Sequence, residues 1–228
     1  MLNKEIIQRT QSAYSHGVQS DDSRLSNRHI FNTASSIRAR LLTQEAKKNQ
    51  RISDWAYQML ECVELIKAPL NECPCTPQSG CTILRSRHKI PSPMVTASKT
   101  MIIVTGLEGR LTITETTFET MKFAKGRRFT KTSPEFFIKN GYIYITANLI
   151  LETIVIKGLF NDTIAAWKFP SVCNPQGISP CMSNLDYEFP YEDDLVDALV
   201  QLAAQELIQL FGNSREDKKN NTSDDSQP

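Results

Sequence analysis

The sequence has few glycines, and they form none of the motifs that bind nucleotide phosphates. Only 9 of its 228 residues are glycine, and neither Gly-x4-Gly-Lys-Ser/Thr nor Gly-x-Gly-x-x-Gly occurs. ATP- and NAD-dependent chemistry therefore lack their usual signatures. The Gly-x-Ser-x-Gly turn of hydrolases is also missing, and His16, His29 and His88 lie in three unrelated contexts. These absences give no indication of an enzyme.

Long apolar runs are absent as well. No window approaches the roughly 18 apolar residues that a membrane helix needs, and the first residues lack the apolar region of a signal peptide. We therefore expect synthesis and folding in the cytoplasm and no membrane partner. With 40% apolar and 22% charged residues, the composition is that of one or two folded domains.

The charge is distributed unevenly, although the formal net charge is only +1. Residues 1–60 carry a net charge of +4, residues 61–185 carry +5, and residues 186–228 carry −8. A basic body with an acidic end is typical of a chain whose acidic segment meets a basic surface, on itself or on a neighbour. A solvated acidic tail that improves solubility is the alternative interpretation.

Four of the six cysteines lie close together, at Cys62, Cys73, Cys75 and Cys81. Structural zinc sites use Cys-x2-Cys pairs, because the short loop aims both thiolates at one metal ion. The spacing here, Cys-x10-Cys-x-Cys-x5-Cys, contains no such pair. These four residues are candidate metal ligands, with free thiols as the simpler interpretation.

The remaining cysteines, Cys173 and Cys181, are separated by a segment that contains proline and glycine. They can pair with each other or join the first four. Because the cytoplasm is reducing, we expect no disulfide in the folded chain there, although a particle released from the cell can oxidise later.

The first 60 residues have the periodicity of helices. Leu2 and Ile6 share a face of a first helix, which Gly17 is expected to end. A group of N-cap residue types at residues 20–23 precedes a second helix. The apolar stripe of that helix is Leu25, Ile30, Ala34, Ile37 and Leu41. Residues 52–60 are compatible with a third helix or with the start of a strand.

From residue 61 to about residue 160 the pattern favours β-structure. Runs rich in β-branched and aromatic residues predict strands at residues 101–105, 111–114, 136–139, 142–146 and 149–156. Asn140 and Gly141 tolerate the positive φ angles of a type I′ turn and so predict a hairpin. Because no helical period separates these runs, we expect a small antiparallel sandwich or barrel.

Residues 190–212 contain the clearest helix signals. Pro190 precedes the helix, acidic residues fill its first turn, and Gly212 follows its end. Its wide apolar stripe is expected to pack on the N-terminal helices. Residues 213–228 contain no aliphatic or aromatic side chain, so we expect a tail that is disordered until it binds a partner.

Together these patterns predict an α+β fold. N-terminal helices in residues 1–60 and the C-terminal helix in residues 190–212 are expected to pack together. Between them lies a β-rich domain with long irregular loops, residues 61–189, built as a small antiparallel β-sandwich or barrel. Residues 213–228 form a tail arm.

Two basic stretches, residues 85–89 and 125–131, are candidates for contact with other molecules. Lys and Arg neutralise phosphate, and Phe129 offers a stacking surface. Neither stretch matches a groove-reading or RNA-binding motif, so a solvated loop, or a loop that contacts acidic segments of a neighbouring subunit, is favoured. The candidates for contact with a subunit or a channel are Arg85, Arg87, Lys89, Lys125, Arg127, Arg128 and Lys131.

Several short blocks, taken in order along the chain, carry a resemblance to a known family. They are residues 21–30 (DDSRLSNRHI), 62–65 (CVEL), 72–75 (ECPC), 80–81 (GC), 137–142 (FIKNGY), 158–160 (GLF) and 188–190 (EFP). As a set they resemble virion structural proteins of crAss-like podoviruses that infect Bacteroides. Within these particles the sequence is most similar to the ring proteins of the neck and tail, which are head-to-tail connectors.

The resemblance implies a non-enzymatic connector that assembles as a ring of twelve subunits below the portal. Its implied partners are other copies of itself, the portal protein, other neck and tail ring proteins, and genomic DNA that passes through the channel without sequence specificity. It implies a location in the virion after synthesis in the cytoplasm of the host bacterium. It supplies no catalytic residues and no cofactor.

Two other hypotheses remain open from the sequence. One is a DNA-binding accessory protein with a cysteine-bound zinc ion. The other is a small hydrolase whose carboxylates are scattered along the chain. Zinc content with salt-dependent DNA binding tests the first, and an activity screen tests the second.

Overall fold

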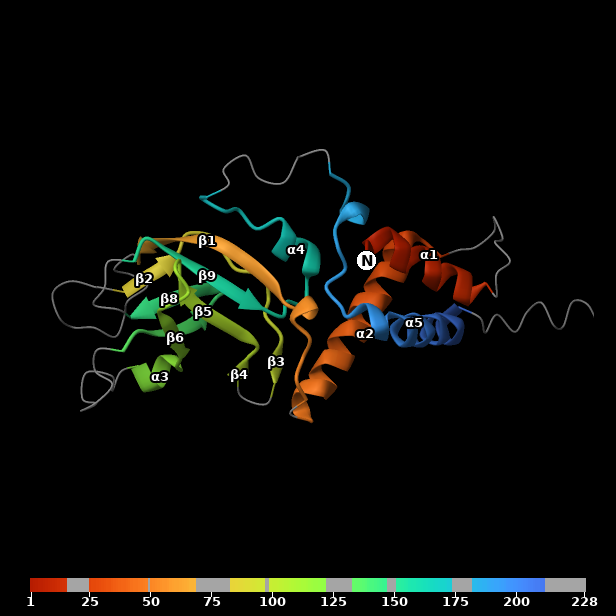
Figure 1. Cartoon of the computed structure of the whole chain (residues 1–228), viewed down its shortest axis with the longest axis horizontal. Helices are drawn as coiled ribbons and strands as arrows, with labels where there is room; N and C mark the ends of the chain where they lie inside the picture. Colours follow the sequence, from red (N-terminus) through yellow and green to blue (C-terminus); the bar gives the residue numbers. More distant parts are fainter. Residues whose placement is uncertain are drawn as a thin grey trace, which may run out of the picture.

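The computed structural model describes residues 1–15, 25–48, 50–68, 83–96, 99–121, 133–146, 151–173 and 182–211. Figure 1 shows an elongated molecule with a β-barrel at one end and helices at the other. The fold is therefore α+β, as the sequence predicted. Within the described residues, no helix is long and apolar enough to cross a membrane.

The helical elements are α1 (Asn3–Tyr14), α2 (Asn27–Lys47), α3 (Phe118–Met121), α4 (Thr163–Trp167) and α5 (Val196–Phe211), with the 3-10 turns η1 (Asp54–Ala56), η4 (Asn184–Asp186) and η5 (Asp193–Leu195). The strands are β1 (Gln58–Lys67), β2 (Ile83–Ser86), β3 (Val95–Thr96), β4 (Lys99–Thr100), β5 (Ile102–Gly106), β6 (Thr112–Glu115), β7 (Glu135–Lys139), β8 (Tyr142–Thr146) and β9 (Thr153–Gly158).

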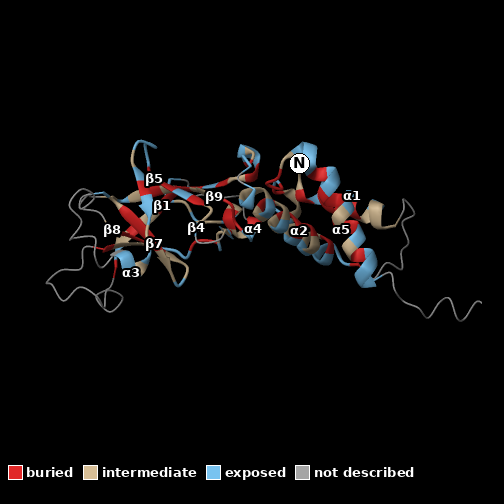
Figure 2. Ribbon diagram, turned by 90° about the horizontal axis from the view of Figure 1, so that it is seen from below, coloured by how far each residue is buried: buried red, intermediate tan, exposed pale blue. Residues whose placement is uncertain are grey.

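The helices α1, α2 and α5 pack around one apolar cluster. Ile6 of α1, Ile37 of α2 and Leu199 of α5 belong to it, and each is at most 1% exposed. Figure 2 shows that these helices bury their facing sides and expose the others. This packing is compatible with the predicted contact between the two ends of the chain.

Acidic residues near α5 form ion pairs with basic groups near the N-terminus. The N-terminal amino group lies 3.6 Å from Asp193, and Arg9 lies 3.3 Å from Asp197. Such exposed pairs contribute little to stability. They do show that part of the acidic end meets basic groups of the same chain.

The ends of the helices differ in detail from the sequence-based boundaries. Helix α2 is capped by Ser26, whose hydroxyl accepts a hydrogen bond of 3.3 Å from the His29 N–H. The predicted capping residues 20–23 and the predicted stop at Gly17 lie outside the described residues. Helix α5 starts at Val196, because the acidic residues after Pro190 first form the turn η5.

Seven strands close into a barrel in the order β1-β2-β8-β7-β6-β5-β9, and β3 and β4 form a separate pair. The barrel was one of the two predicted β architectures. The expectation of purely antiparallel pairing is wrong, because β6 and β7 run parallel. Seven strands cannot alternate in direction all the way around a closed barrel, so at least one neighbouring pair must be parallel.

The predicted hairpin is confirmed: β7 and β8 are joined at Asn140 and Gly141, which have φ angles of 53° and 81°. Residues 52–60 form the entry to a strand, since η1 is followed by β1 at Gln58. This strand begins before the expected boundary at residue 60. The short elements β2, β3, β4, α3 and α4 were not predicted.

A disulfide joins Cys62 on β1 to Cys173, which follows α4. Cys62 lies where the register of β1 against β9 shifts, and its φ angle is 48°. The expectation of a free thiol is therefore wrong for Cys62, and of the two alternatives for Cys173 the bond to one of the first four cysteines is the one observed. The 111 residues between them explain the failure, because neighbouring cysteines in the sequence gave no sign of this pairing.

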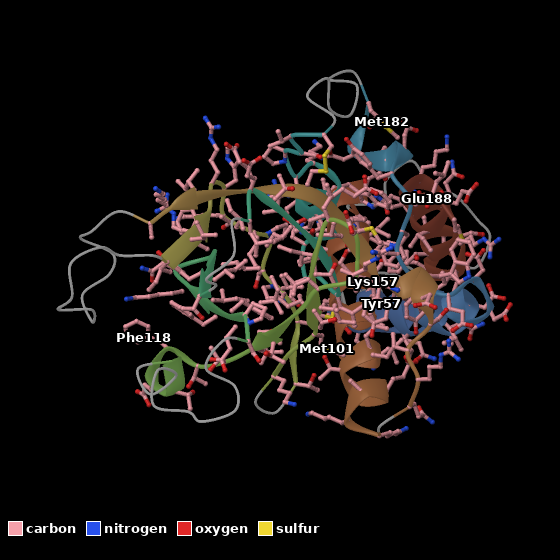
Figure 3. The ribbon with its side chains drawn as sticks, turned by 60° about the vertical axis from the view of Figure 1, so that its left-hand side comes forward. Tyr57, Met101, Phe118, Lys157, Met182 and Glu188 are labelled. Atoms are coloured by element: carbon pink, nitrogen blue, oxygen red, sulfur yellow. A yellow bond between two sulfur atoms is a disulfide. The ribbon has the colours of Figure 1, made fainter. Side chains whose placement is uncertain are left out.

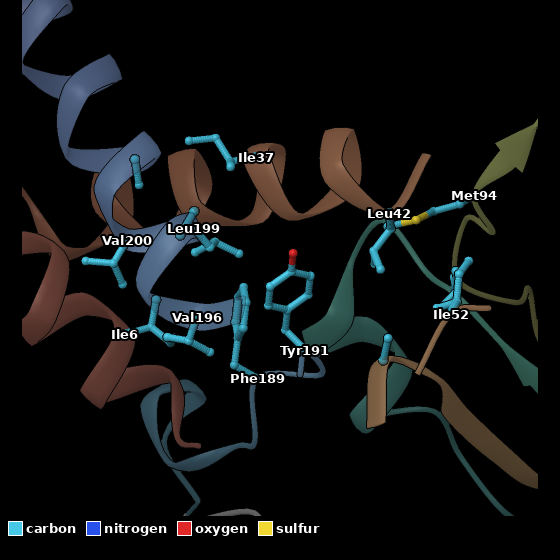
Figure 4. Packing of buried hydrophobic residues seen from close by; sticks show 14 residues of the cluster. Ile6, Ile37, Leu42, Ile52, Met94, Phe189, Tyr191, Val196, Leu199 and Val200 are labelled. Carbon is cyan, nitrogen blue, oxygen red and sulfur yellow. The ribbon is translucent and has the colours of Figure 1, made fainter. Parts of the chain in front are cut away.

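One buried side chain connects the barrel to the helices. Arg38 of α2 is fully buried and donates hydrogen bonds to the backbone oxygens of Pro190 (2.6 Å), Phe160 (3.0 Å) and Ala56 (3.1 Å). These carbonyls lie where the chain enters the barrel, leaves it, and approaches α5. Phe189 and Tyr191 point toward α2 beside this junction (Figure 4).

Candidate subunit-contact surfaces

A basic and aromatic surface lies on the outside of the barrel. The Arg85 guanidinium lies 4.4 Å from the centre of the Tyr142 ring, and the Lys89 amine lies 5.8 Å from it. On the next strand, the Lys139 amine lies 4.6 Å from the centre of the Phe118 ring. We call these five residues the basic face. Cations held over aromatic rings are common at protein interfaces.

The barrel register places these side chains outward. Along β8, Ile143 and Ile145 are fully buried in the barrel core, so the alternate residues Tyr142 and Tyr144 point outward. Tyr144 stacks on Phe137 of β7 at 5.0 Å between ring centres. The basic face is thus built on a packed aromatic layer.

Arg87, the other predicted contact residue in this region, has an acidic partner on its own chain. Its guanidinium donates to both carboxylate oxygens of Glu64, at 3.0 and 2.9 Å. Part of its charge is therefore balanced within the subunit. The structure places Arg85 and Lys89 near the same aromatic side chain, Tyr142. Arg87 lies instead beside Glu64 of β1.

The remaining predicted site residues lie outside the described part of the chain. They are Cys73, Cys75, Cys81, Lys125, Arg127, Arg128 and Lys131. Cys62, the fourth candidate metal ligand, is bonded to Cys173 and in this form offers no thiolate. Among the described residues, no group of three or more His, Cys, Asp and Glu side chains is placed to hold a metal ion.

A second surface, which the sequence did not predict, carries exposed apolar side chains. Trp55 is 78% exposed, Met59 is 54% exposed and Ile103 is 50% exposed. Met59 and Ile103 are both paired with Lys157, on the two sides of β9, so the three form one row across the barrel with the lysine in the middle. We call these three apolar residues the apolar face. Exposed apolar residues that gather in this way mark interaction sites more often than isolated ones.

Local contacts hold the apolar face in place. The Lys157 amine donates a 2.8 Å hydrogen bond to Asp54 and lies 5.1 Å from the centre of the Tyr57 ring. This hydrogen bond lowers the pKa of Asp54 below its usual value. Figure 3 shows Tyr57 and Lys157 side by side and Phe118 of the basic face well away from them.

On the side of Trp55, the edge of the apolar face is acidic. A hollow of about 400 Å³ lies beside Trp55, and its lining includes Trp167 and Tyr191. The carboxylates that line it are Asp54, Glu188, Glu192, Asp193 and Asp194. We call these five residues the acidic rim. Cations also lie close to this rim: the N-terminal amino group is near Asp193, and Lys157 and Arg51 are near Asp54.

The centres of the two surfaces lie on opposite sides of the barrel, while their edges meet where β1, which carries Met59, pairs with β2, which carries Arg85. Strand β9, which carries Lys157, is separated from β8, which carries Tyr142, by two strands in one direction and three in the other. Their outward faces therefore point away from each other. No single copy of the chain can bring its apolar face onto its own basic face.

A further hollow, of about 930 Å³, lies between α2 and α4. Its lining is mostly amide and hydroxyl side chains, with one basic and one acidic residue, Arg28 and Asp162. No histidine or cysteine is among the lining residues.

Comparison with known proteins gives two matches. A family model described as phage tail ring protein 2 matches residues 5–226. The chain is also 28% identical over 220 residues to Ring protein 2 of Bacteroides phage crAss001, and the alignment covers 91% of each protein. The family match extends over the helices, the barrel and the two surfaces described above.

Proposed function

The chain belongs to the phage tail ring protein 2 family, and on this premise we propose that it is a head-to-tail connector subunit of the virion. Twelve copies form a ring that joins the portal to the tail and surrounds the channel through which DNA leaves. The resemblance found in the sequence is confirmed by the family match. The protein is a structural component of the phage tail.

The observation that carries the proposal is the length of the family match, from residue 5 to residue 226. A ring subunit needs two different contact surfaces, because each copy meets one neighbour on each side. The apolar face with its acidic rim and the basic face provide two such surfaces. This role requires no catalysis.

The charge distribution supports passage of DNA through the ring without sequence specificity. Residues 61–185 carry a net charge of +5, and basic groups attract phosphate regardless of base sequence. The candidates for contact with neighbours or with the channel remain Arg85, Arg87, Lys89, Lys125, Arg127, Arg128 and Lys131. Residues 213–228 act as an arm that binds the portal or a neighbouring subunit.

The proposal is tested by the mass of the native protein, alone and after mixing with the portal protein of the same phage. One chain has a mass of 25.8 kDa, so a ring of twelve has a mass of about 310 kDa. We expect this species, or a larger one that contains the portal protein, by light scattering after size exclusion. A monomer under both conditions contradicts the proposal.

The zinc-dependent alternative has lost support, because Cys62 is bonded to Cys173. Zinc analysis of the purified protein tests it directly. A stoichiometric amount of zinc that is retained after dialysis is the result that would favour it.

A further inference from the structure

We propose that the apolar face of one copy binds the basic face of the next copy, with the acidic rim opposite Arg85, Lys89 and Lys139. This inference rests on the proposed function, since it assigns the contact by which the ring is built. It commits to a second copy of this chain as the occupant of the apolar face.

The apolar face has the composition of an interface centre. Exposed tryptophan and methionine are enriched at protein interfaces, and a tryptophan in a central position commonly contributes most of the binding energy. Trp55 of η1 and Met59 of β1 are exposed, while Ala56 and Leu60, which follow them in the chain, are buried. The exposure of Trp55 therefore comes from its place in the chain, where burial of its neighbours turns it outward.

The rim and the basic face have opposite charge. Around Trp55 stand five carboxylates, of which Asp193 and Asp54 have a cation nearby. On the other side of the barrel, Arg85, Lys89 and Lys139 gather over two aromatic rings. Complementary charges of this kind orient partners and reject wrong ones. In this proposal, the uneven distribution of charge along the sequence orients neighbouring copies of the chain.

The aromatic rings add a second form of complementarity. Cations attract the face of a tryptophan ring more strongly than that of other aromatic side chains. Lys89 is exposed and lies at the upper limit of contact with Tyr142, at 5.8 Å. Trp55 of the neighbouring copy provides a better partner for it.

The placement of the two surfaces makes the contact one between unlike faces. Because they lie on opposite sides of the barrel, each copy offers the apolar face to one neighbour and the basic face to the other. Such a contact repeats from copy to copy, and it closes into a ring when the rotation between copies divides a full turn.

The experiment uses charge reversal in the full chain. Glu188→Lys places a cation in the acidic rim, and Lys89→Glu places a carboxylate on the basic face. Each variant alone puts like charges together at every contact, so we expect self-association to weaken about tenfold. The measurement is the association constant from sedimentation equilibrium.

Mixing the two variants gives the decisive result. In an alternating ring, every contact pairs either the two wild-type charges or the two reversed charges, so all contacts are again complementary. We expect the mixture to associate nearly as well as the wild type. Recovery on mixing cannot arise from damaged folding of either variant.

The matched controls lie on the turn between β5 and β6, away from both faces. Glu108→Lys and Arg110→Glu make the same changes of charge at exposed positions. Leu107→Ala, also exposed, is the control for Trp55→Ala. We expect about thirtyfold weaker association for Trp55→Ala and wild-type association for the three controls.

The outcomes separate this inference from the proposed function. A wild type that associates, with both charge reversals equal to it, contradicts the interface and leaves the ring intact. Weakened single variants that do not recover on mixing also contradict it. A wild type that stays monomeric at every concentration and with the portal protein contradicts the ring and the interface together.

Discussion

Arg38 is a buried cation that donates three hydrogen bonds to backbone oxygens. Burial lowers the pKa of its guanidinium to about 10, and Tyr191 acts in the opposite direction. At neutral pH the group stays charged, because this value is far above 7. Carbonyl dipoles from three segments thus replace the water that the cation loses.

The first prediction concerns this side chain. Arg38→Met removes donors from three buried carbonyls and should lower the free energy of unfolding by about 3 to 5 kcal/mol. Arg40→Met is the control, since Arg40 is exposed and its ion pair with Glu206, at 3.7 Å, should contribute under about 1 kcal/mol. Urea unfolding measures both. If the two substitutions lower the free energy of unfolding by equal amounts, the hydrogen bonds of Arg38 do not hold the three segments together.

A second prediction concerns Tyr191 and alkaline pH. Burial raises the pKa of this phenol to about 12, with Glu45 as a further cause. In the unfolded chain the phenol ionises near pH 10, so between pH 10 and pH 12 the folded protein binds more protons. This contribution to stability is complete below pH 10 and is lost as the pH rises through 12.

The measurement compares wild type with Tyr191→Phe. The free energy of unfolding of the wild type should fall more steeply with pH between 10 and 12, because phenylalanine has no proton to lose. Parallel pH profiles would contradict the assignment. Tyr142→Phe is the control, because Tyr142 is only half-buried and lies beside cations.

For single residues, the sequence predicts the role of those that depend only on the local backbone conformation. Asn140 and Gly141 follow from the needs of a two-residue turn. Arg38 could not be predicted, because nothing in its helix shows that three distant carbonyls converge on it. The sequence shows that residue 55 is a tryptophan, but it does not show that the side chain is exposed, because exposure depends on tertiary packing.

Among the elements, β1 has a shift in its register against β9, and Cys62, which forms the disulfide, lies at this shift. The disulfide links β1 to the segment after α4. A bond across 111 residues restricts the unfolded chain, which by the chain-entropy model stabilises the fold by about 5 kcal/mol.

The third prediction follows from this bond. Cys173→Ser should lower the free energy of unfolding by about 5 kcal/mol under oxidising conditions. With a reductant present, the wild type and the variant should unfold at the same denaturant concentration. Guanidinium unfolding with and without reductant measures both. A wild type that is insensitive to reductant would show that the bond does not stabilise the chain.

A fourth prediction concerns the contact of β5 with β9. A Cβ atom at Gly158 would lie 2.5 Å from the Ile102 Cγ2 atom and 3.2 Å from the Met101 carbonyl oxygen. Gly158→Ala should therefore cost about 1 to 3 kcal/mol of unfolding free energy. Gly106→Ala, whose nearest neighbour would be 3.3 Å away, should cost less. Thermal unfolding compares the two, and a reversed order would contradict the argument.

The sequence predicts long and periodic elements better than short ones. The helices α2 and α5 and the hairpin of β7 and β8 were found because their patterns extend over many residues. Strands β2, β3 and β4 have two to four residues each, too few for alternation to be recognised. The parallel pair of β6 and β7 depends on closure of the barrel, which no local pattern encodes.

For the whole molecule, the proposed contact between copies combines a charged rim with an apolar centre. Salt shortens the range of charge interactions from about 10 Å at 0.1 M to about 3 Å at 1 M. The fifth prediction is that self-association weakens about tenfold across this range, while the unfolding midpoint of the subunit changes little. Sedimentation at several salt concentrations measures it. Association that is unchanged or strengthened would show that charge does not guide assembly.

The hydrogen bonds of Arg38 also bear on how such a protein can change during evolution. Ala56 and Phe160, where the chain enters and leaves the barrel, accept hydrogen bonds from one guanidinium and are therefore neighbours in space. A segment whose two ends are neighbours can be lengthened, shortened or exchanged without moving the rest of the chain. We therefore expect the barrel to be the part that diversifies between phages, while the helices keep a common framework.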